Sequence, residues 1–391
     1  MFSLLLAIIY LAFISLGLPD SLLGSAWPVM HEDLGVAIAY AGIPAMIIAG
    51  GTIVSSLLSD RVTKKFGAGT VTAVSVLMTA LGLFGFSLSK SFIVICLWAF
   101  PYGLGAGAVD AALNNYVALH YASRHMSWLH CFWGIGASVS PYIMGWSLSH
   151  GFGWSGGYRT VGIIQIVLTA FLFLSLPLWK KTKEERSKQT HSLFEVIKIR
   201  GVPLVLICFF AYCALESTAG LWASSYLVKG RGVDSETAAG FASLFYLGIT
   251  SGRFLNGFVA DRIASRNLIR IGLSVIVLGI ALIFLPVKFL ALSGLVVAGF
   301  GCAPIYPSII HATPANFGSN YSQAIIGIQM AGAYVGSTFM PPLFGFIAGK
   351  IGIVFYPFYL LVFALLMILT SETLNRKLAQ KKQEIEKIQA A

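Results

Sequence analysis

Ser56-Leu-Leu-Ser-Asp60-Arg61 and Gly257-Phe-Val-Ala-Asp261-Arg262 are two similar segments, 201 residues apart, and each ends a long apolar run. Lys64-Lys65 follows the first Asp-Arg pair, and Arg266 follows the second. A small residue four positions before the aspartate allows two helices to approach closely. Because one such segment is weak evidence but two at equivalent places are strong, we predict a chain made of two repeated halves.

The composition indicates an integral membrane protein. The 391 residues are 57% hydrophobic and only 10% charged, whereas a soluble domain carries about 25% charged residues. The apolar runs continue for about twenty residues, which is the length a helix needs to cross the hydrocarbon core. Strands of a membrane barrel would alternate in polarity instead. We therefore expect an all-α membrane protein, with the first run a spanning helix and not a removable signal peptide.

Twelve spans are predicted, six in each half. A polar segment over 180–200 is interpreted as a cytoplasmic linker between a six-helix bundle over 1–179 and a second one over 201–373, and 374–391 forms a cytoplasmic tail. The spans are expected at 3–27, 37–58, 68–88, 91–117, 127–149, 159–179, 202–228, 237–260, 268–286, 289–311, 321–347 and 352–371.

The net charge of +11 lies in the loops and does not indicate nucleic-acid binding. Lys and Arg are about three times as frequent in the segments on the side of the N-terminus as on the opposite side. Because positive loops stay in the cytoplasm, we expect both termini there and the chain in the cell membrane, with several passes.

Three carboxylates lie inside apolar runs, far from any loop: Asp20, Asp110 and Glu216. A charge near the bilayer centre costs from about 3 kcal/mol to more than about 10 kcal/mol, depending on how it is relieved. Such groups persist only where they face protein or water. They therefore indicate a polar path through the membrane.

Span 4 carries Asp110 and Asn114, which share one helix face because they are four residues apart. Asn115 follows. The preceding glycines do not have the spacing of a dinucleotide-binding loop. Asp110 is interpreted as a cavity residue, with a helix–helix hydrogen-bonding role as the alternative.

In span 1, Pro19 precedes Asp20. Proline removes a backbone hydrogen bond, and the freed carbonyl needs a partner or water. An acidic group beside such a turn suits a cation or a hydroxyl. The alternative is that Asp20 caps local backbone.

The second half contains Tyr212 and Glu216 on one face of span 7, Trp222 nearby, and Arg253 in span 8, the only Lys or Arg away from the ends of a predicted span. Trp222 is interpreted as a platform for an apolar sugar face or as packing. A buried Arg requires a carboxylate partner, and Glu216, Asp110 and Asp20 are the candidates within the spans. We favour a gating role for Arg253.

Further candidates complete the predicted site. His130 could titrate near neutral pH or serve in helix packing. The predicted substrate contacts are Asn114, Asn115, His130, Trp133, Glu216, Trp222, Tyr306 and Gln329, and the predicted gate comprises Asp60, Arg61, Arg253, Asp261 and Arg262.

The repeated loops and the six-plus-six organisation resemble the major facilitator superfamily over nearly the whole chain. Asp20, Asp110-x-x-x-Asn114, Tyr-x-x-x-Glu216, Gly252-Arg253-Phe254 and Ala303-Pro-Ile-Tyr-Pro307 are similar to the fucose–galactose–glucose:proton symporters. The resemblance implies two bundles around a central cavity, alternating access, and Asp20 and Asp110 as the coupling and sugar-binding pair. Two departures are Ser56 in place of glycine and Asp110 in place of the more frequent glutamate.

We therefore expect proton-coupled uptake of a small polar solute such as a monosaccharide, with Asp110 as the first proton site and Asp20 as the second. The alternatives are a proton-driven exporter of an amphipathic compound and a sodium-coupled sugar symporter. The chain has no catalytic, metal or phosphate-loop pattern, so we expect no enzyme activity, no cofactor and no metal. The expected partners are the substrate, protons or sodium, and the lipid bilayer, with the protein a monomer.

Overall fold

The computed structural model describes residues 4–179 and 191–390, so most of the predicted 180–200 linker lies outside the described residues. Within these ranges the chain is helical and contains no strand. Nine helical segments there are long and apolar enough to cross a membrane. The predicted all-α membrane fold is confirmed, and α6, α11 and α15 supply helices at the remaining three predicted spans.

The chain divides into two compact units. Unit 1 comprises residues 1–117 and 128–191, and unit 2 comprises 118–127 and 192–391. The short segment Ala118–Ser127, between two helices of the first half, is thus grouped with unit 2. The sequence pattern placed this segment in the first bundle.

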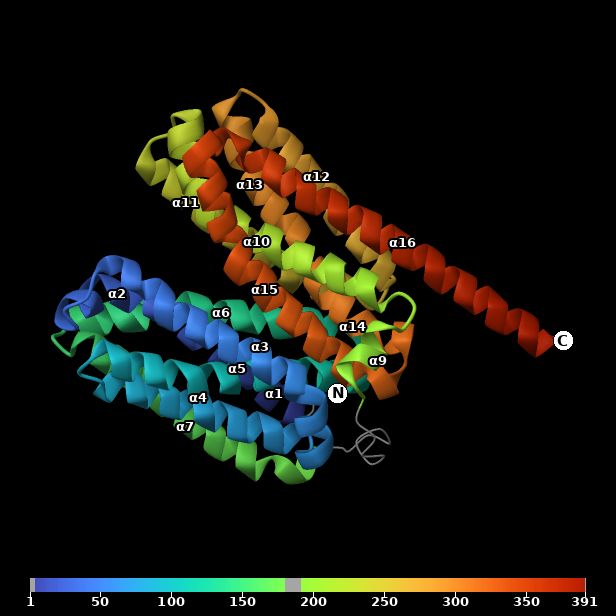
Figure 1. The fold of residues 1–391 in the computed structure, drawn as a ribbon, viewed down its shortest axis with the longest axis horizontal. Coiled ribbons are helices and arrows are strands. Elements are labelled where there is room, and N and C mark those ends of the chain that lie inside the picture. The colour runs from blue at the N-terminus through green and yellow to red at the C-terminus, as the bar shows by residue number, and fades with distance from the viewer. Residues whose placement is uncertain (1–3, 180–190, 391) are drawn as a thin grey trace. The chain divides into compact units, whose positions relative to one another are not determined.

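Unit 1 is built from the first six predicted spans (Figure 1). The first span is divided into two α-helices, whereas each of the next five contains one α-helix, with a short 3-10 turn beside it in the second and the sixth. The elements are α1 (Leu4–Asp20), α2 (Leu22–Asp33), η1 (Ile38–Ala41), α3 (Gly42–Phe66), α4 (Ala68–Leu88), α5 (Phe92–His120), α6 (Ser123–Ser149), α7 (Gly153–Leu174) and η2 (Leu176–Leu178).

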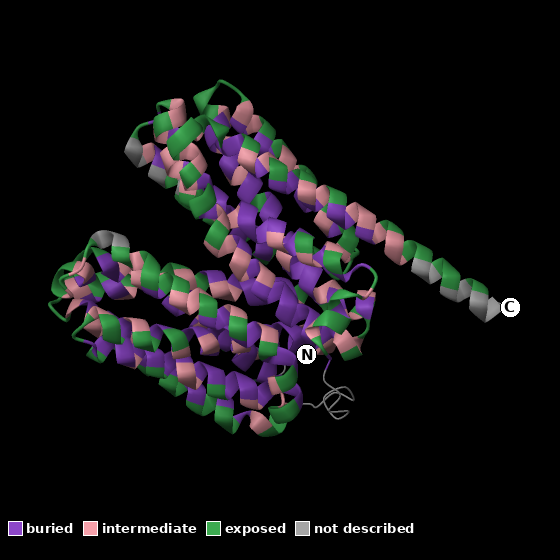
Figure 2. Cartoon of the chain, viewed as in Figure 1, coloured by how far each residue is buried: buried purple, intermediate pink, exposed green. Residues whose placement is uncertain are grey.

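Unit 2 contains the other six spans. The tenth is divided at Ala303-Pro304, as the two prolines of that stretch predict. The elements are α9 (Leu193–Ile197), α10 (Val202–Arg231), α11 (Ser235–Val259), α12 (Ser265–Phe284), α13 (Lys288–Cys302), α14 (Ile305–Phe317), α15 (Ser319–Ile351), η3 (Ile353–Phe355) and α16 (Tyr356–Ala390). In Figure 2 the buried positions of α16 give way to exposed ones toward its C-terminal end, where the predicted tail continues the last spanning helix without a break.

Pro19 creates the polar link that joins three helices of unit 1. Proline cannot donate a hydrogen bond to the carbonyl four residues before it, which here belongs to Ser15. Gln165 of α7 donates to that carbonyl at 2.8 Å through Nε2, and its Oε1 accepts from Thr79 of α4 at 2.8 Å. The carbonyl freed by Pro19 is therefore satisfied within the protein, and α1, α4 and α7 are held together at this level.

Glycines bring α1 and α6 into backbone contact. A Cβ atom on Gly17 would overlap the carbonyl of Trp133, and one on Gly136 would overlap the carbonyl of Ile14. Small residues at helix crossings allow such close approach in membranes. Because Asp20 and Trp133 lie one turn from these contacts, the crossing also determines where their side chains meet.

The α3–α5 crossing is similar and explains why Ser56 is tolerated. Gly103 and Gly107 of α5 face the backbone of α3, where any side chain would overlap the carbonyls of Ile48 and Thr52. Ser56 donates through Oγ to the carbonyl of Gly107 at 3.4 Å. A small hydroxyl residue can therefore take the place of glycine in the first repeat segment, because the glycines of α5 leave room for its side chain.

We predict that Gly136→Ala destabilises the protein. The added methyl would collide with the α1 backbone, and overpacking of this kind costs about 1–3 kcal/mol. The change is measured as a shift in the unfolding midpoint when the purified protein is heated in detergent.

Gly145→Ala on the same helix is the matched control, because a Cβ there meets nothing within 4 Å. It is expected to leave the unfolding midpoint unchanged or slightly higher, as alanine is the better helix former. Equal destabilisation by both variants would contradict a close α1–α6 crossing.

Candidate functional site

Asp20 and Trp133 form the first polar pair of unit 1. The indole N–H of Trp133 donates to Oδ2 of Asp20 at 2.9 Å, so α6 holds the carboxylate of α1 in place. The Asp20 residue is nevertheless exposed. A carboxylate exposed on a spanning helix is stable only where water reaches it. Asp20 is therefore suited to an aqueous pathway, and its hydrogen bond to the Trp133 side chain gives no support to the alternative of local backbone capping.

Asp110, Asn114 and His130 form a buried hydrogen-bonded chain. Asn114 Nδ2 donates to Asp110 Oδ1 at 2.7 Å, and Asn114 Oδ1 lies 3.1 Å from His130 Nε2. The three residues are exposed by 6%, 0% and 5%, respectively. The first two lie on α5 and the third on α6. The i, i+4 spacing predicted the Asp110–Asn114 contact, but only the folded chain brings His130 to it.

The amide of Asn114 determines where the proton of His130 lies. Because its NH₂ group donates to Asp110, its oxygen is the atom that faces His130 and can only accept. The hydrogen bond therefore requires a proton on Nε2. The ring of Phe13 in α1 meets the His130 ring edge-on, with centroids 5.4 Å apart. These contacts hold two titratable side chains in one orientation inside unit 1.

Unit 2 contains a buried acid–base pair. Arg253 of α11 is only 3% exposed, and its Nη2 lies 3.5 Å from both Glu216 Oε1 and Tyr212 Oη of α10. Its guanidinium also lies 5.9 Å from the ring centroid of Tyr306 on α14, a cation–π distance. Of the carboxylates considered from the sequence, Glu216 is thus the one paired with Arg253. Removing either partner would leave a buried charge without its counterpart.

Three other predicted contacts of unit 2 have partners within the unit. Trp222 donates its indole N–H to the carbonyl of Pro341 at 2.9 Å, and Tyr306 donates its hydroxyl to Met330 Sδ at 3.2 Å. Gln329 accepts from Thr313 at 3.3 Å, but its Nε2 has no hydrogen-bond partner among the described residues. Trp222 therefore uses its polar atom for packing α10 against α15, whereas Gln329 keeps a donor for a polar ligand.

The two repeated Asp-Arg segments have different ion-pair partners. Asp60 is buried and pairs with Lys64 at 2.9 Å, and its Oδ2 accepts from the backbone N–H of His191 at 3.1 Å. Asp261 is exposed, pairs with Arg124 at 3.2 Å, and accepts from the backbone N–H of that residue at 3.0 Å. Neither partner is the adjacent arginine: Lys64 lies four residues after Asp60 on the same helix, whereas Arg124 is distant from Asp261 in sequence and the sequence pattern did not indicate it.

The Ala118–Ser127 segment is held to α11 and α14 within unit 2. Besides the Arg124–Asp261 pair, Asn256 donates to Ser127 Oγ at 2.7 Å and His311 Nε2 lies 3.2 Å from the carbonyl of Tyr121. Burial and the neighbouring Arg124 guanidinium lower the pKa of His125, which favours a neutral ring there.

Among the predicted residues of unit 1, the structure brings together Asp20 with Trp133, and Asp110 with Asn114 and His130. Asn115 is buried next to them in sequence. Glu216 and Arg253 meet in unit 2. Gln165 and Asn256, which both make buried hydrogen bonds between helices, were not among the residues predicted from the sequence. Each is an amide side chain within an apolar run, and this pattern could have indicated them.

Comparison with known proteins identifies the family. The sequence profile of the family described as "Major Facilitator Superfamily" matches residues 9–323 and 205–389 of this chain. The chain belongs to the major facilitator superfamily. It is therefore a multi-pass membrane transporter of small molecules, as the resemblance in the repeated loops predicted.

Relatives and solved structures of this superfamily cover most of the chain. The cis,cis-muconate transport protein of Acinetobacter baylyi is 25% identical, over 88% of each chain. The glucose/mannose transporter GlcP of Bacillus subtilis is 25% identical, over 76% of this chain and 77% of its own. Bypass of stop codon protein 6 of Saccharomyces cerevisiae is 24% identical over 64% of this chain, which spans only 56% of that relative.

The fold is that of the Escherichia coli fucose:proton symporter FucP, with a TM-score of 0.80 at 15% identity. The match covers 94% of this chain and 98% of the symporter. At this identity the likeness concerns the fold alone, so substrate and coupling must be argued from the residues.

We predict that Asn114→Leu destabilises unit 1 by about 2–4 kcal/mol, because two buried polar groups each lose a partner. A double-mutant cycle with His130→Phe tests the mechanism by thermal unfolding. In the His130→Phe background, Asn114→Leu should cost clearly less, since the hydrogen bond between Asn114 and His130 is already gone. Additive losses would contradict a connected chain.

Proposed function

We propose that the protein is a proton-coupled symporter of a small polar solute such as a monosaccharide. The observation that supports this most strongly is the buried chain Asp110–Asn114–His130 in a span of unit 1. Asp110 is the proton site, and Asp20, held by Trp133, is the second acidic group. In this proposal unit 1 performs the proton coupling.

The coupling follows from the cost of charge in a closed, apolar site. An ionised carboxylate is stable while water or a hydrogen-bond donor faces it, and it opposes closure once water is removed. Protonation of Asp110 and binding of substrate together leave a neutral site that can close and reopen on the other side. Release of the proton inside then resets the carrier.

Several polar groups suit a hydroxyl-rich substrate. Asn114, Asn115, His130 and Trp133 in unit 1 are the proposed contacts there, and Glu216, Tyr306 and Gln329 are those in unit 2. Gln329 is the strongest of the second set because its buried amide retains an unused donor. Trp222 remains a candidate only through its ring face, since its N–H already binds the carbonyl of Pro341. The named glucose/mannose relative supports a sugar substrate.

A second candidate substrate is a small carboxylate. It is favoured by the buried guanidinium of Arg253, held beside Glu216 and the rings of Tyr212 and Tyr306. The muconate-transporting relative is consistent with this substrate class. A thermal-shift screen of the purified protein against sugars, sugar acids and dicarboxylates separates the two classes, because a ligand stabilises the folded state that binds it.

Sodium coupling is less well supported than proton coupling. A sodium site, as predicted from the sequence, relies on a backbone carbonyl that Pro19 frees near Asp20. That carbonyl, of Ser15, already accepts from Gln165. Ion replacement in transport assays distinguishes sodium from protons.

We predict that Asp110→Asn abolishes accumulation of substrate against a gradient in proteoliposomes energised by a pH difference. The amide is nearly isosteric but cannot take up and release a proton. Exchange of labelled for unlabelled substrate should persist, because it requires no net proton movement. Retained uphill accumulation would overturn the assignment of Asp110.

Glu32→Gln is the matched control for this experiment. It neutralises an exposed carboxylate near the end of α2 and should leave accumulation unchanged. A loss equal to that of Asp110→Asn would indicate a general effect of charge.

The direction of transport gives a further prediction. Adding substrate outside weakly buffered cells that produce the protein should make the medium alkaline, because protons enter with the solute. Acidification of the medium would indicate the proton-driven exporter instead. Neither change, together with a requirement for sodium in uptake, would favour the sodium symporter. Protease cleavage of a tag at each terminus in inverted but not in right-side-out vesicles of the cell membrane tests whether both termini are cytoplasmic and whether the protein resides in that membrane.

A further inference from the structure

Unit 2 contains a cavity of about 460 Å³ that lies away from the Arg253–Glu216 pair. It lies where the first turns of α10 and α12 meet the last turns of α14 and the middle of α16. Apolar side chains make most of its wall, namely Val205, Ile269, Ile309, Ala312, Leu374 and Leu378. Its volume is in the range of a small-molecule site.

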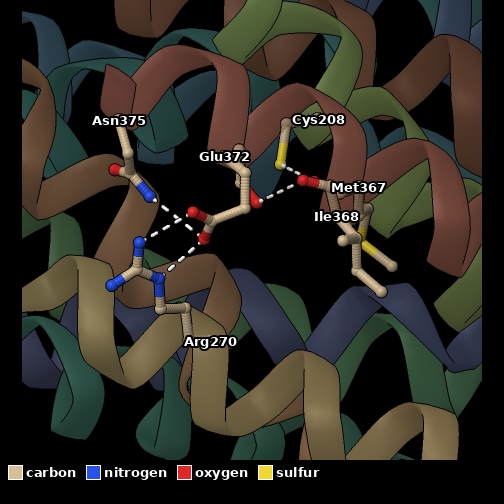
Figure 3. Close-up of polar contacts among 7 residues, drawn as sticks. Cys208, Arg270, Met367, Ile368, Glu372 and Asn375 are labelled. Atoms are coloured by element: carbon tan, nitrogen blue, oxygen red, sulfur yellow. Dashed lines mark hydrogen bonds and ion pairs between the residues drawn. The ribbon is translucent and has the colours of Figure 1, made fainter.

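One edge of the cavity is polar and carries a cation. Arg266, Ser265, Asn316 and Asn375 line it, and Arg266 is exposed. Among the described residues Arg266 has no ion pair, whereas Arg270, one turn further along α12, is bound by both carboxylate oxygens of Glu372 at 2.6 and 2.7 Å (Figure 3). The charge of Arg270 is therefore compensated, and that of Arg266 is available to a ligand.

The remaining polar wall favours an anion as well. In Figure 3, Asn375 points to Glu372, and its Nδ2 lies 3.4 Å from Glu372 Oε1. The Glu372 carboxylate therefore accepts from two residues, Arg270 and Asn375. Cys208, also of the wall, donates its thiol toward the carbonyl of Met367 at 3.9 Å. No carboxylate is among the described residues that line the cavity. An anionic group at Arg266 would thus meet a cation beside the polar side chains of Ser265 and Asn316 and no uncompensated negative charge.

We propose that this cavity binds an anionic phospholipid, with its phosphate at Arg266 and the start of an acyl chain against the apolar wall. The cavity lies on spanning helices at the level where their apolar residues give way to polar ones, as in α16. Basic pockets between spanning helices on the positive side of a membrane protein bind acidic headgroups. A soluble anion would contact only the cation, whereas a phospholipid would also contact the apolar wall through its acyl chain. The presence of both features therefore favours a lipid.

Native mass spectrometry of the full-length protein in detergent tests the proposal, with phosphatidylglycerol and phosphatidylcholine of the same acyl chains as probes. The wild-type protein should retain phosphatidylglycerol at least about tenfold more tightly than phosphatidylcholine, the effect of one charge-assisted contact. Arg266→Gln should abolish this preference. Equal retention of the two lipids by the wild-type protein would overturn the proposal.

Two further variants separate the cavity from general surface charge. Ala315→Phe places a ring in the cavity without changing charge and should weaken phosphatidylglycerol binding about tenfold or more. Arg376→Gln removes an equally exposed positive charge of α16 that does not line the cavity, and should retain the preference. Loss of the preference in Arg376→Gln, or undiminished phosphatidylglycerol binding in Ala315→Phe, would contradict the site.

Soluble glycerol 3-phosphate distinguishes the source of the anion. It should fail to displace the lipid, because it cannot use the apolar wall. Displacement at equal concentration would mean that the site recognises a soluble phosphate, and the lipid proposal would be wrong. The unfolding midpoint of each variant without lipid verifies that the protein is folded.

Discussion

The cost of an unpaired polar group inside the hydrocarbon region is the constraint on which this structure depends. Lipid offers no hydrogen bonds, so a buried donor, acceptor or charge is stable where it has a partner within the chain or faces water or a ligand. The carbonyl of Ser15, freed by Pro19, accepts from Gln165. Arg253 lies beside Glu216, and Asp110 accepts from Asn114. The same requirement that holds the helices together thus also places the groups from which transport is argued.

Close helix crossings make these partnerships geometrically feasible. At Gly17 and Gly136, α1 and α6 touch through their backbones, and one turn away Trp133 reaches Asp20. The second unit uses the same device, because Gly279 and Gly294 bring α12 and α13 together. Small residues therefore act indirectly on function: they set the distance at which a side chain of one helix meets a carboxylate of the next.

The proposed coupling relies on a difference between the two acidic groups of unit 1. Asp110 is buried and bound to Asn114, which in turn binds His130. Asp20 is exposed and accepts from one indole. The buried group has more to gain from protonation when its surroundings close, whereas the exposed group can exchange with water. This difference is the physical basis for assigning them different parts of a transport cycle.

The sequence by itself determined the membrane class, the helical fold, the two repeated halves and the unusual carboxylates, because hydrophobic run length, proline positions and i, i+4 spacing are local properties. The two prolines of the tenth span correctly predicted a disturbed helix there, which is divided at Ala303-Pro304, and the buried Arg253 correctly predicted a carboxylate partner. Only the tertiary structure decided which carboxylate this is, that His130 reaches Asn114, that Asp261 pairs with Arg124, and that the N–H of Trp222 binds Pro341. These contacts join residues on different helices or turns, and their distances depend on the rotation and crossing of packed helices, which no local pattern contains.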